Sequence, residues 1–311
     1  MTSAPVTPRR PPARSGSTAV RPRQPARRGG RRPARRSRRA RRAAVGRGLG
    51  WLAAVAALTL VAVLAVHRDA PGTTPIAGRC TVAGSDLTLT TAQAANAATI
   101  AAVARSRGLP QRATVIALAT AQQESRIRNL DYGDRDSLGL FQQRPSQGWG
   151  SEAQVQDPVY ATGKFLDGLV KVPGWETGDL TTTADAVQRS AFPLAYRQWT
   201  GMAQTLAGAL LSDSPAQLSC TFSPPQASGP VEDRAAAVAD VVRREAGTPT
   251  VLPGGLVSVA AAGWPEASWA VAHAERLQLA GVRFADWSWS PGGGWVQTGE
   301  VVGDLQLQLA N

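Results

Sequence analysis

The residues of this chain best suited to chemistry are one carboxyl group near the end of a predicted helix and a loop that begins a short way after it. Glu124 and Ser125 close the segment Ala-Thr-Ala-Gln-Gln-Glu-Ser, and Gly139-Leu-Phe-Gln142 begins fourteen residues after Ser125. One proton donor beside the bridging oxygen is the minimum equipment for expelling a sugar leaving group. The pair therefore indicates a protein that breaks glycosidic bonds.

Two helices are expected to position this carboxyl group. Thr90-Thr91 can cap a helix that runs through Ala104, and Gly108-Leu-Pro110 stops it. A second helix is predicted from about Gln111 to Ser125, with the bulky apolar residues on one face and Glu124 among small residues on another.

Glu124 falls in the last turn of the second predicted helix, where the negative end of the helix dipole disfavours an ionised carboxylate. The small neighbours leave room for a ligand, and together these effects predict a raised pKa, which suits a general acid. The alternative interpretation is an ordinary solvated glutamate that pairs with Arg126 or Arg128.

The two motifs resemble those of a known family. Glu124-Ser125 with Gly139-Leu140-Phe141-Gln142 resembles the Glu-Ser and Gly-Leu-Met-Gln pair of the soluble lytic transglycosylases and goose-type lysozymes, with Phe141 at the methionine position. The resemblance extends over roughly residues 87–211. It implies a lysozyme-like helical domain in which Glu124 protonates the oxygen between N-acetylmuramic acid and N-acetylglucosamine, and in which the loop lines the saccharide cleft. No cofactor is expected.

The resemblance also implies a set of substrate-binding residues. Glycines permit close backbone approach, and an amide side chain both donates to and accepts from sugar hydroxyls. The expected set is Ser125, Gly139, Leu140, Phe141, Gln142, Gln143, Gln188 and Tyr196. Trp149, Tyr160, Trp175 and Trp199 could stack on sugars or belong to the core.

A third family element, Ala-Tyr-Asn, is replaced here by a segment that begins Ala186-Val-Gln188 and continues to Tyr196. Either Gln188 stands where the family has its tyrosine, or Tyr196 reaches in from the next helix, which Pro193 can begin. Both alternatives stay open on the sequence.

Acidic residues in the loop bear on the reaction. Goose-type lysozymes carry acids there that are thought to position a water molecule, so Asp134 and Asp136 are candidate catalytic residues, and a second carboxylate would favour hydrolysis with inversion. Without one, the 6-hydroxyl of the sugar attacks and an anhydro product forms. The alternative is a purely structural role for Asp131, Asp134 and Asp136, because aspartate stabilises turns and Arg135 can pair locally.

The amino-terminal part differs from the rest in composition. Residues 1–47 hold sixteen arginines and no acidic residue, which predicts a disordered tail. The 18 remaining basic residues (34 − 16) face 22 acidic ones, so the rest of the chain is mildly acidic. Attraction of the tail to anionic lipid is favoured over nucleic-acid binding, because aromatic residues that stack on bases are missing.

Residues 48–66 are nineteen residues without a charge, long enough to span a bilayer. The arginine excess before them predicts a single-pass membrane protein with a cytoplasmic amino terminus and extracytoplasmic domains. A cleaved signal peptide is the alternative. A linker follows over residues 67–86.

The two cysteines, Cys80 and Cys220, bracket the candidate site, so a disulfide is expected, with two buried thiols as the alternative. Residues 222–311 are predicted to form a linker and a small α/β domain, with helices at Val231–Glu245 and Ala267–Gln278, a strand from Gly281 and a turn at Gly292. His67 and His273 are the two histidines, and no ligand set with metal spacing accompanies them, so no metal site is expected.

The expected fold is mainly α: a disordered basic tail, one transmembrane helix, a lysozyme-like domain over residues 87–221 and the small α/β domain. The expected function is cleavage of peptidoglycan glycan strands by Glu124 as general acid and then base. The alternative from another class is a catalytically weak peptidoglycan-binding or scaffolding protein of the cell wall.

Overall fold

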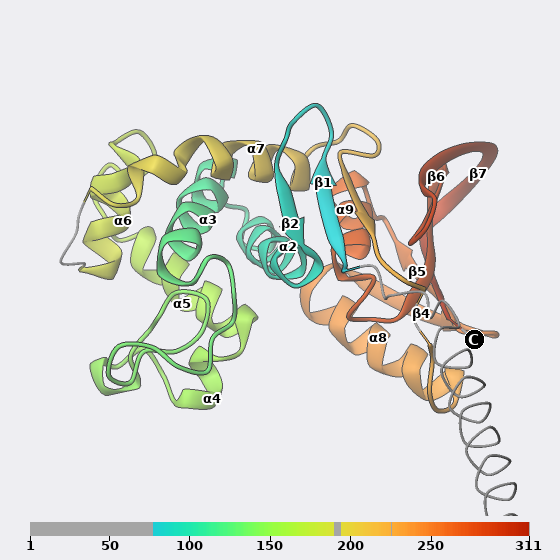
Figure 1. Cartoon of the computed structure of the whole chain (residues 1–311), viewed down its shortest axis with the longest axis horizontal. Coiled ribbons are helices and arrows are strands. Elements are labelled where there is room, and N and C mark those ends of the chain that lie inside the picture. The colour runs from blue at the N-terminus through green and yellow to red at the C-terminus, as the bar shows by residue number, and fades with distance from the viewer. Residues whose placement is uncertain (1–76, 190–193, 225, 311) are drawn as a thin grey trace, which may run out of the picture. The chain divides into compact units, whose positions relative to one another are not determined.

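The computed structural model describes residues 77–189, 194–224 and 226–310. Within the compact unit that ends the chain, the alanine-rich helix α2 (Thr91–Ser106) lies at the centre (Figure 1). Thr90 caps it together with Gln93, because each side chain bonds the backbone amide of the other residue. Almost every residue of α2 from Ala94 to Ala104 is buried, so other elements cover it on all sides.

Helices that carry the candidate site lie on one side of α2 (Figure 1). They are α3 (Gln111–Ser125), α4 (Glu152–Val155), α5 (Pro158–Leu169) and α6 (Leu180–Gln188), with the short 3-10 helices η1 (Pro145–Gln147) and η2 (Arg197–Trp199). Helix α7 (Thr200–Leu210) packs against both α3 and α2.

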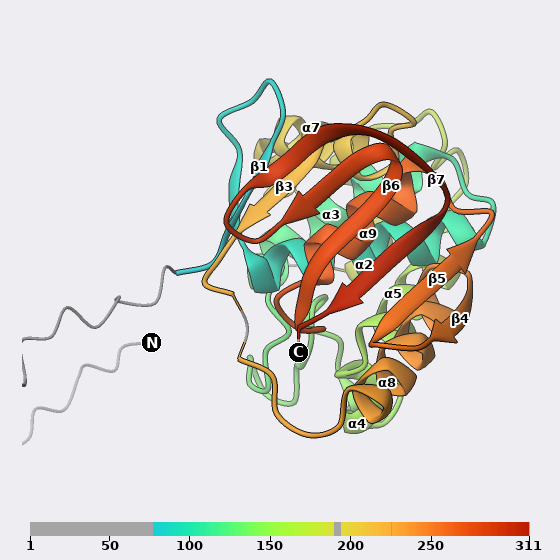
Figure 2. The same ribbon diagram turned by 90° about the vertical axis from the view of Figure 1, so that its right-hand side faces the viewer.

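The other side of α2 is covered by α8 (Val231–Glu245) and α9 (Trp264–His273), and an antiparallel sheet packs against these two helices. The sheet has the order β4-β5-β7-β6, and Figure 2 shows it with α9 behind it. Its strands are β4 (Thr248–Leu252), β5 (Leu256–Ala260), β6 (Leu279–Ser290) and β7 (Gly294–Leu309). In β7 the inward residues Leu305, Leu307 and Leu309 alternate with glutamines, as in a strand with one buried face.

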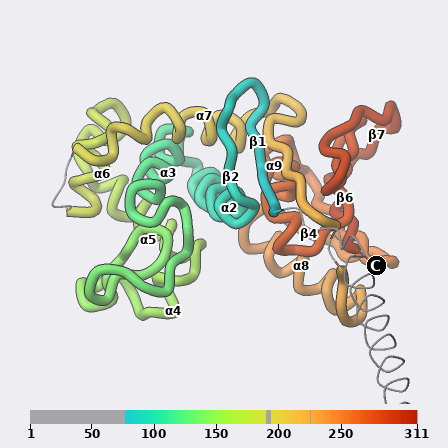
Figure 3. Tube along the Cα trace, viewed as in Figure 1, coloured from blue at the N-terminus to red at the C-terminus, as the bar shows by residue number. Residues whose placement is uncertain are grey.

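A second, three-stranded antiparallel sheet has the order β2-β1-β3. It consists of β1 (Arg79–Val82), β2 (Thr88–Thr90) and β3 (Leu218–Thr221), and β1 and β3 lie side by side although they are far apart in the sequence (Figure 3). Cys80 and Cys220 are directly opposite each other in this pairing and form a disulfide, which confirms that prediction. The bond ties together the two ends of the segment that carries the candidate site.

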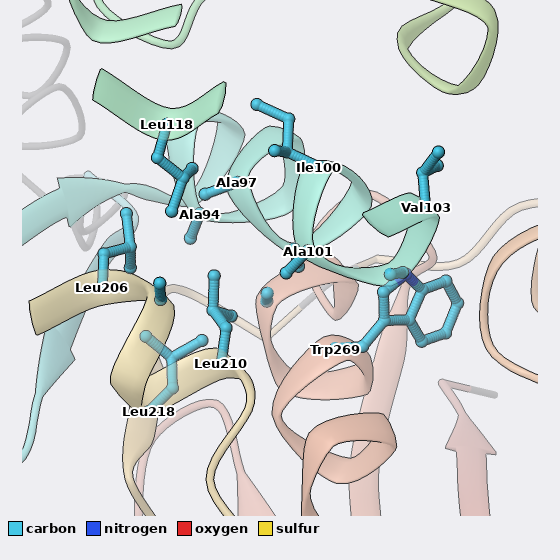
Figure 4. Packing of buried hydrophobic residues seen from close by; sticks show 14 of the residues in the cluster. Ala94, Ala97, Ile100, Ala101, Val103, Leu118, Leu206, Leu210, Leu218 and Trp269 are labelled. Atoms are coloured by element: carbon cyan, nitrogen blue, oxygen red, sulfur yellow. The ribbon is translucent and has the colours of Figure 1, made fainter. Parts of the chain in front are cut away.

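One hydrophobic core runs through these layers. Figure 4 shows Leu118 of α3, Ile100 and Ala101 of α2, and Leu210 of α7 pointing into it, with Trp269 of α9 against α2. Alanines on α2 bring the neighbouring helices close, so α9 contacts the same central helix as α3. Helices from both predicted domains thus bury their apolar faces against α2.

A buried polar cluster joins α2, α8 and α9. Glu245, with 6% of its side chain exposed, accepts hydrogen bonds from the Thr99 hydroxyl at 2.7 Å and from the Trp269 indole N–H at 2.9 Å. His273 is fully buried, and its Nδ1 lies 2.9 Å from the Trp269 carbonyl, to which it donates as Nδ1–H. Burial, reinforced by the charge of Arg276, lowers the pKa of His273 well below its usual value, so the ring is neutral.

The observed fold corrects the prediction of a mainly α protein. Of the described residues, 43% are helical and 22% lie in strands, and both sheets are antiparallel, so the fold belongs to the α+β class. The prediction failed because the strands β1–β3 are only three or four residues long and because the alternating residues of β7 were not recognised as a strand.

The predicted single-pass membrane topology is also corrected. Across the part of the chain that the structure describes, no helix has both the length and the apolar character needed to cross a bilayer. The predicted span 48–66 and the arginine-rich tail 1–47 lie outside the described residues. The membrane assignment and the localisation drawn from it therefore have no support in the structure and are withdrawn.

Candidate active site

Glu124 lies in the last turn of α3, at a helix end that is held in place by its backbone. Arg126 and Ile127 both adopt left-handed conformations, with φ of 56° and 55°. The amide of Arg126 donates to the Gln122 carbonyl and that of Ile127 to the Ala121 carbonyl, both at 3.0 Å. The chain therefore changes direction immediately after the turn that carries the carboxyl group. The Ile127 side chain is fully buried and anchors this helix end in the core.

Ser125 connects this helix end to the glycine-bounded loop. Its hydroxyl is buried and lies 2.7 Å from the Leu140 carbonyl and 3.0 Å from the Ala121 carbonyl, to either of which it donates. It also accepts a hydrogen bond from the Arg128 amide at 3.2 Å. Ser125 therefore positions the loop against α3.

The loop itself is built around residues of the core. Gly139 has a φ of +78°, and a Cβ added there would lie 2.2 Å from the Val155 carbonyl oxygen, so only glycine fits. Leu140 and Phe141 are fully buried, and the Phe141 ring stacks on Phe165 with a centroid distance of 4.7 Å. The phenylalanine at the methionine position thus fills core space.

The two glutamines of the loop have different surroundings. Gln142 is partly exposed in a left-handed conformation, and its amide nitrogen lies 3.3 Å from the carbonyls of Tyr132 and Gly139. Gln143 is buried and donates to the Ala161 carbonyl at 3.1 Å. Of the two, Gln142 is the one that a ligand can reach.

Both candidates for the third family element meet Glu124. The Tyr196 hydroxyl donates to Glu124 Oε1 at 2.7 Å. Gln188, the last residue of α6, hydrogen-bonds the same carboxyl group and donates to the Phe141 carbonyl at 2.8 Å. Both residues are brought to the carboxyl group because the end of α6 and the residue before η2 converge on the end of α3.

Burial raises the pKa of Glu124 above its usual value, and the hydrogen bonds from Tyr196 and Gln188 oppose this in part. The net direction of the pKa shift is upward, and its cause is burial and not the helix dipole from which it was predicted. A carboxyl group with a raised pKa keeps more of its proton near neutrality and can deliver it to a leaving group.

The loop aspartates are occupied with other partners. Asp136 accepts hydrogen bonds from the Ser146 amide and from Arg144, both at 2.8 Å, and these bonds hold its pKa well below its usual range. The Asp134 side chain is 89% exposed and lies 3.9 Å from Arg135. Among the described residues, neither carboxylate contacts Glu124, and both have the surroundings of loop-structuring residues.

An open cavity of about 810 Å³ adjoins this arrangement. It is bounded by the segment after η1, by one face of α5 and the residues that follow it, and by the end of α6. Its lining includes Trp149, Lys164, Asp167, Lys171, Gln188 and Arg189. Gln188 lines this cavity and is also a partner of Glu124, so one residue links the carboxyl group to the cavity.

Further residues of the site were not predicted from the sequence. The Gln123 side chain accepts hydrogen bonds from the Trp199 indole N–H at 2.8 Å and from the Gln198 amide at 3.3 Å. These bonds hold η2, and with it Tyr196, against α3. Lys164 and Lys171 were also missed, although a usable signal existed, because they are the two lysines of the whole chain.

A search of the described residues for three or more histidine, cysteine or acidic side chains placed to hold a metal ion finds no such group. Comparison with protein-family models gives no match to this chain, and comparison with curated proteins gives no relative.

Proposed function

We propose that this protein cleaves the glycan strands of peptidoglycan between N-acetylmuramic acid and N-acetylglucosamine, with Glu124 as general acid and then general base. The observation that carries the proposal is a partly buried carboxyl group of raised pKa, hydrogen-bonded by Tyr196 and by Gln188, which lines an open cavity. The resemblance of the Glu-Ser and Gly-Leu-Phe-Gln motifs to lytic transglycosylases and goose-type lysozymes supports the choice of substrate.

The first step is proton transfer. Glu124 donates its proton to the glycosidic oxygen as the bond from that oxygen to the anomeric carbon breaks, and the sugar leaves as an alcohol. The carboxylate that remains is stabilised by the Tyr196 hydroxyl and by Gln188, which already make these bonds. Because both donors are uncharged, they stabilise the anion without lowering the pKa as far as a cation would.

The second step needs a nucleophile. Asp136 is held by Arg144 and by the Ser146 amide, and Asp134 points into solvent with 89% of its side chain exposed, so we assign no water-positioning carboxylate. The 6-hydroxyl of the muramic acid attacks its own anomeric carbon, and Glu124 takes the hydroxyl proton, which restores the acid. The balance is one bond broken, one bond formed and no water consumed, and the product has an anhydro end.

Digestion of purified sacculi by the full chain, followed by mass spectrometry of the released fragments, tests the proposal. Wild type is expected to release anhydro-ended fragments and Glu124→Gln none. Glu176→Gln is a matched control, since Glu176 is exposed and makes no ion pair in the described region, and it should behave as wild type.

Other results of this digestion would contradict parts of the proposal. Equal release by wild type and Glu124→Gln, or no release by either, overturns the proposed cleavage, and glycan binding without cleavage would favour a binding protein instead. Reducing ends in place of anhydro ends would keep Glu124 as the acid and overturn the intramolecular second step.

A further inference from the structure

Lysine is rare in this chain compared with arginine. Of its 34 basic residues only two are lysines, Lys164 and Lys171, and both line the open cavity beside Glu124. Lys164 lies on helix α5, and Lys171 lies in the turn that follows the end of that helix at Leu169. Two cations on long, flexible stems thus face one open space.

The cavity has an excess of positive charge. Its single acidic lining residue, Asp167, is paired with Arg107 at 2.9 Å. Neither Lys164 nor Lys171 has an ion-pair partner among the residues that the structure describes, and Arg189 lines the same cavity. Unpaired cations around a concave surface raise the local concentration of anionic ligands.

The surroundings of the lysines are those of a ligand surface. The Lys164 ammonium lies 5.9 Å from the centroid of the Tyr160 ring, a cation–π contact that limits its motion. Trp149 lines the same cavity, and Gln188 connects it to the catalytic carboxyl group. An anionic group bound here would therefore be close to the glycosidic bond whose oxygen Glu124 protonates.

We infer that this cavity binds the carboxylates of the peptide branches of the glycan strand through Lys164 and Lys171, so that strands bearing peptides are preferred over stripped strands. The inference rests on the proposed function for the identity of the polymer. Peptide branches are attached to the muramic acid, the sugar whose bond is cleaved, so their carboxylates lie within reach of a cavity at the edge of the site.

Binding measurements in the Glu124→Gln background separate recognition from cleavage. The ligands are purified strands with their peptides and strands from which an amidase has removed the peptides. The test variant is Lys164→Gln with Lys171→Gln, and the control is Arg243→Gln with Arg283→Gln, which removes the same charge from an exposed position on α8 and a half-buried position on β6. The arginine-rich tail is identical in all variants.

The parent chain is expected to bind strands with peptides roughly tenfold more tightly than stripped strands, a preference that weakens as salt is added. The double lysine variant should lose the preference, whereas the double arginine control should keep it. Lys164→Arg with Lys171→Arg, which retains both charges, should restore most of it.

Three results would overturn the inference: an unchanged preference in the double lysine variant, an equal loss of binding to both kinds of strand, or a preference that disappears only when phosphate-bearing wall polymers are removed. The proposed cleavage is tested independently by the chain that retains Glu124. If that chain cuts nothing while the lysine-dependent preference persists, the proposed cleavage is wrong and the binding site is supported. If it cuts the strands but shows no lysine-dependent preference, the cleavage is supported and the binding site is wrong.

Discussion

Glu124 and Glu245 are both shielded from water, but their surroundings differ. Glu124 has two uncharged hydrogen-bond donors and an open cavity beside it. Glu245 is enclosed by three helices and contacts Thr99, Trp269 and the ring of His273. The first adjoins an open cavity of about 810 Å³, whereas the second lines a cavity of about 10 Å³, which is too small for a sugar.

If Glu124 is the acid of the proposed reaction, burial alone does not identify a catalytic acid. Glu245 is the more buried of the two, yet its partners come from α2, α8 and α9 and hold these helices together. Glu124 is less buried, but its partners leave one side open. Access combined with a raised pKa is therefore the better criterion.

The same substitution at positions 124 and 245 tests the proposed difference between the two glutamates most strongly. Glu124→Gln is expected to lower the rate of glycan cleavage by roughly 10²- to 10⁴-fold, because an amide cannot donate the proton. Glu245→Gln should leave the rate within about twofold, since its carboxyl group contacts no ligand surface. Rates of fragment release from sacculi at one pH measure both effects, and a loss of similar size at position 245 would contradict the assignment.

The second prediction concerns stability. Glu245→Ala should lower the free energy of unfolding by about 3 kcal/mol, because the Trp269 indole N–H and the Thr99 hydroxyl lose their shared acceptor in the interior. Glu245→Gln keeps an acceptor oxygen and should cost about 1 kcal/mol. Chemical denaturation of the two variants provides the measurement, and equal costs would show that the hydrogen bonds to Glu245 are unimportant.

Much of the helical framework around Glu124 was predictable from local signals. The helix at Gln111–Ser125 and the cap at Thr90 were expected where they occur, because proline, glycine and capping residues mark their ends. The Val231–Glu245 helix was also expected. The last helix was placed too late, since Pro265 and Glu266 already start it at Trp264.

The sheets and the polar contacts were not predictable in the same way. Strands β1 and β3 pair across almost the whole candidate domain, which no local pattern encodes. Sequence reasoning could propose Gln188 or Tyr196 as partners of the acid, but only the packing of α6 and η2 against α3 brings both to it. Asp136 likewise accepts a hydrogen bond from the Ser146 amide, and only the folded chain brings that amide to it.

The pH dependence of stability should have opposite signs at the two sites. The pKa of folded His273 is depressed, so its contribution to stability is complete above about pH 6.5 and is lost as the pH falls below that value, by at most about 1.4 kcal/mol per pH unit. The pKa of folded Glu124 is raised, so its contribution is present at low pH and lost as the pH rises.

Denaturation curves over a range of pH test this expectation. His273→Gln should flatten the acid side of the profile, and Glu124→Gln should remove only the fall in stability that occurs as the pH rises through the pKa of Glu124. A His273→Gln variant that keeps the full loss of stability below pH 6.5 would show that another group is responsible.

The smallest predicted effect is that of Tyr196→Phe. Removing the hydroxyl takes away a hydrogen bond that favours the ionised form of Glu124, so the pKa of Glu124 should rise further. The high-pH limb of the activity profile should move upward by about one pH unit, while the rate at low pH changes little. A downward movement of the limb would show that Tyr196 does not bond the carboxylate during turnover.

The reversal of the chain after Ser125 has a consequence for the motions of the site. Helix ends normally fray, and their amide hydrogens then exchange rapidly with solvent deuterium. Here the amides of Arg126 and Ile127 are bonded back to the last turn, and the Ile127 side chain is fastened in the interior. We therefore expect these amides to exchange as slowly as those in the middle of α3, which would mean that the proton donor is pre-aligned before any sugar arrives.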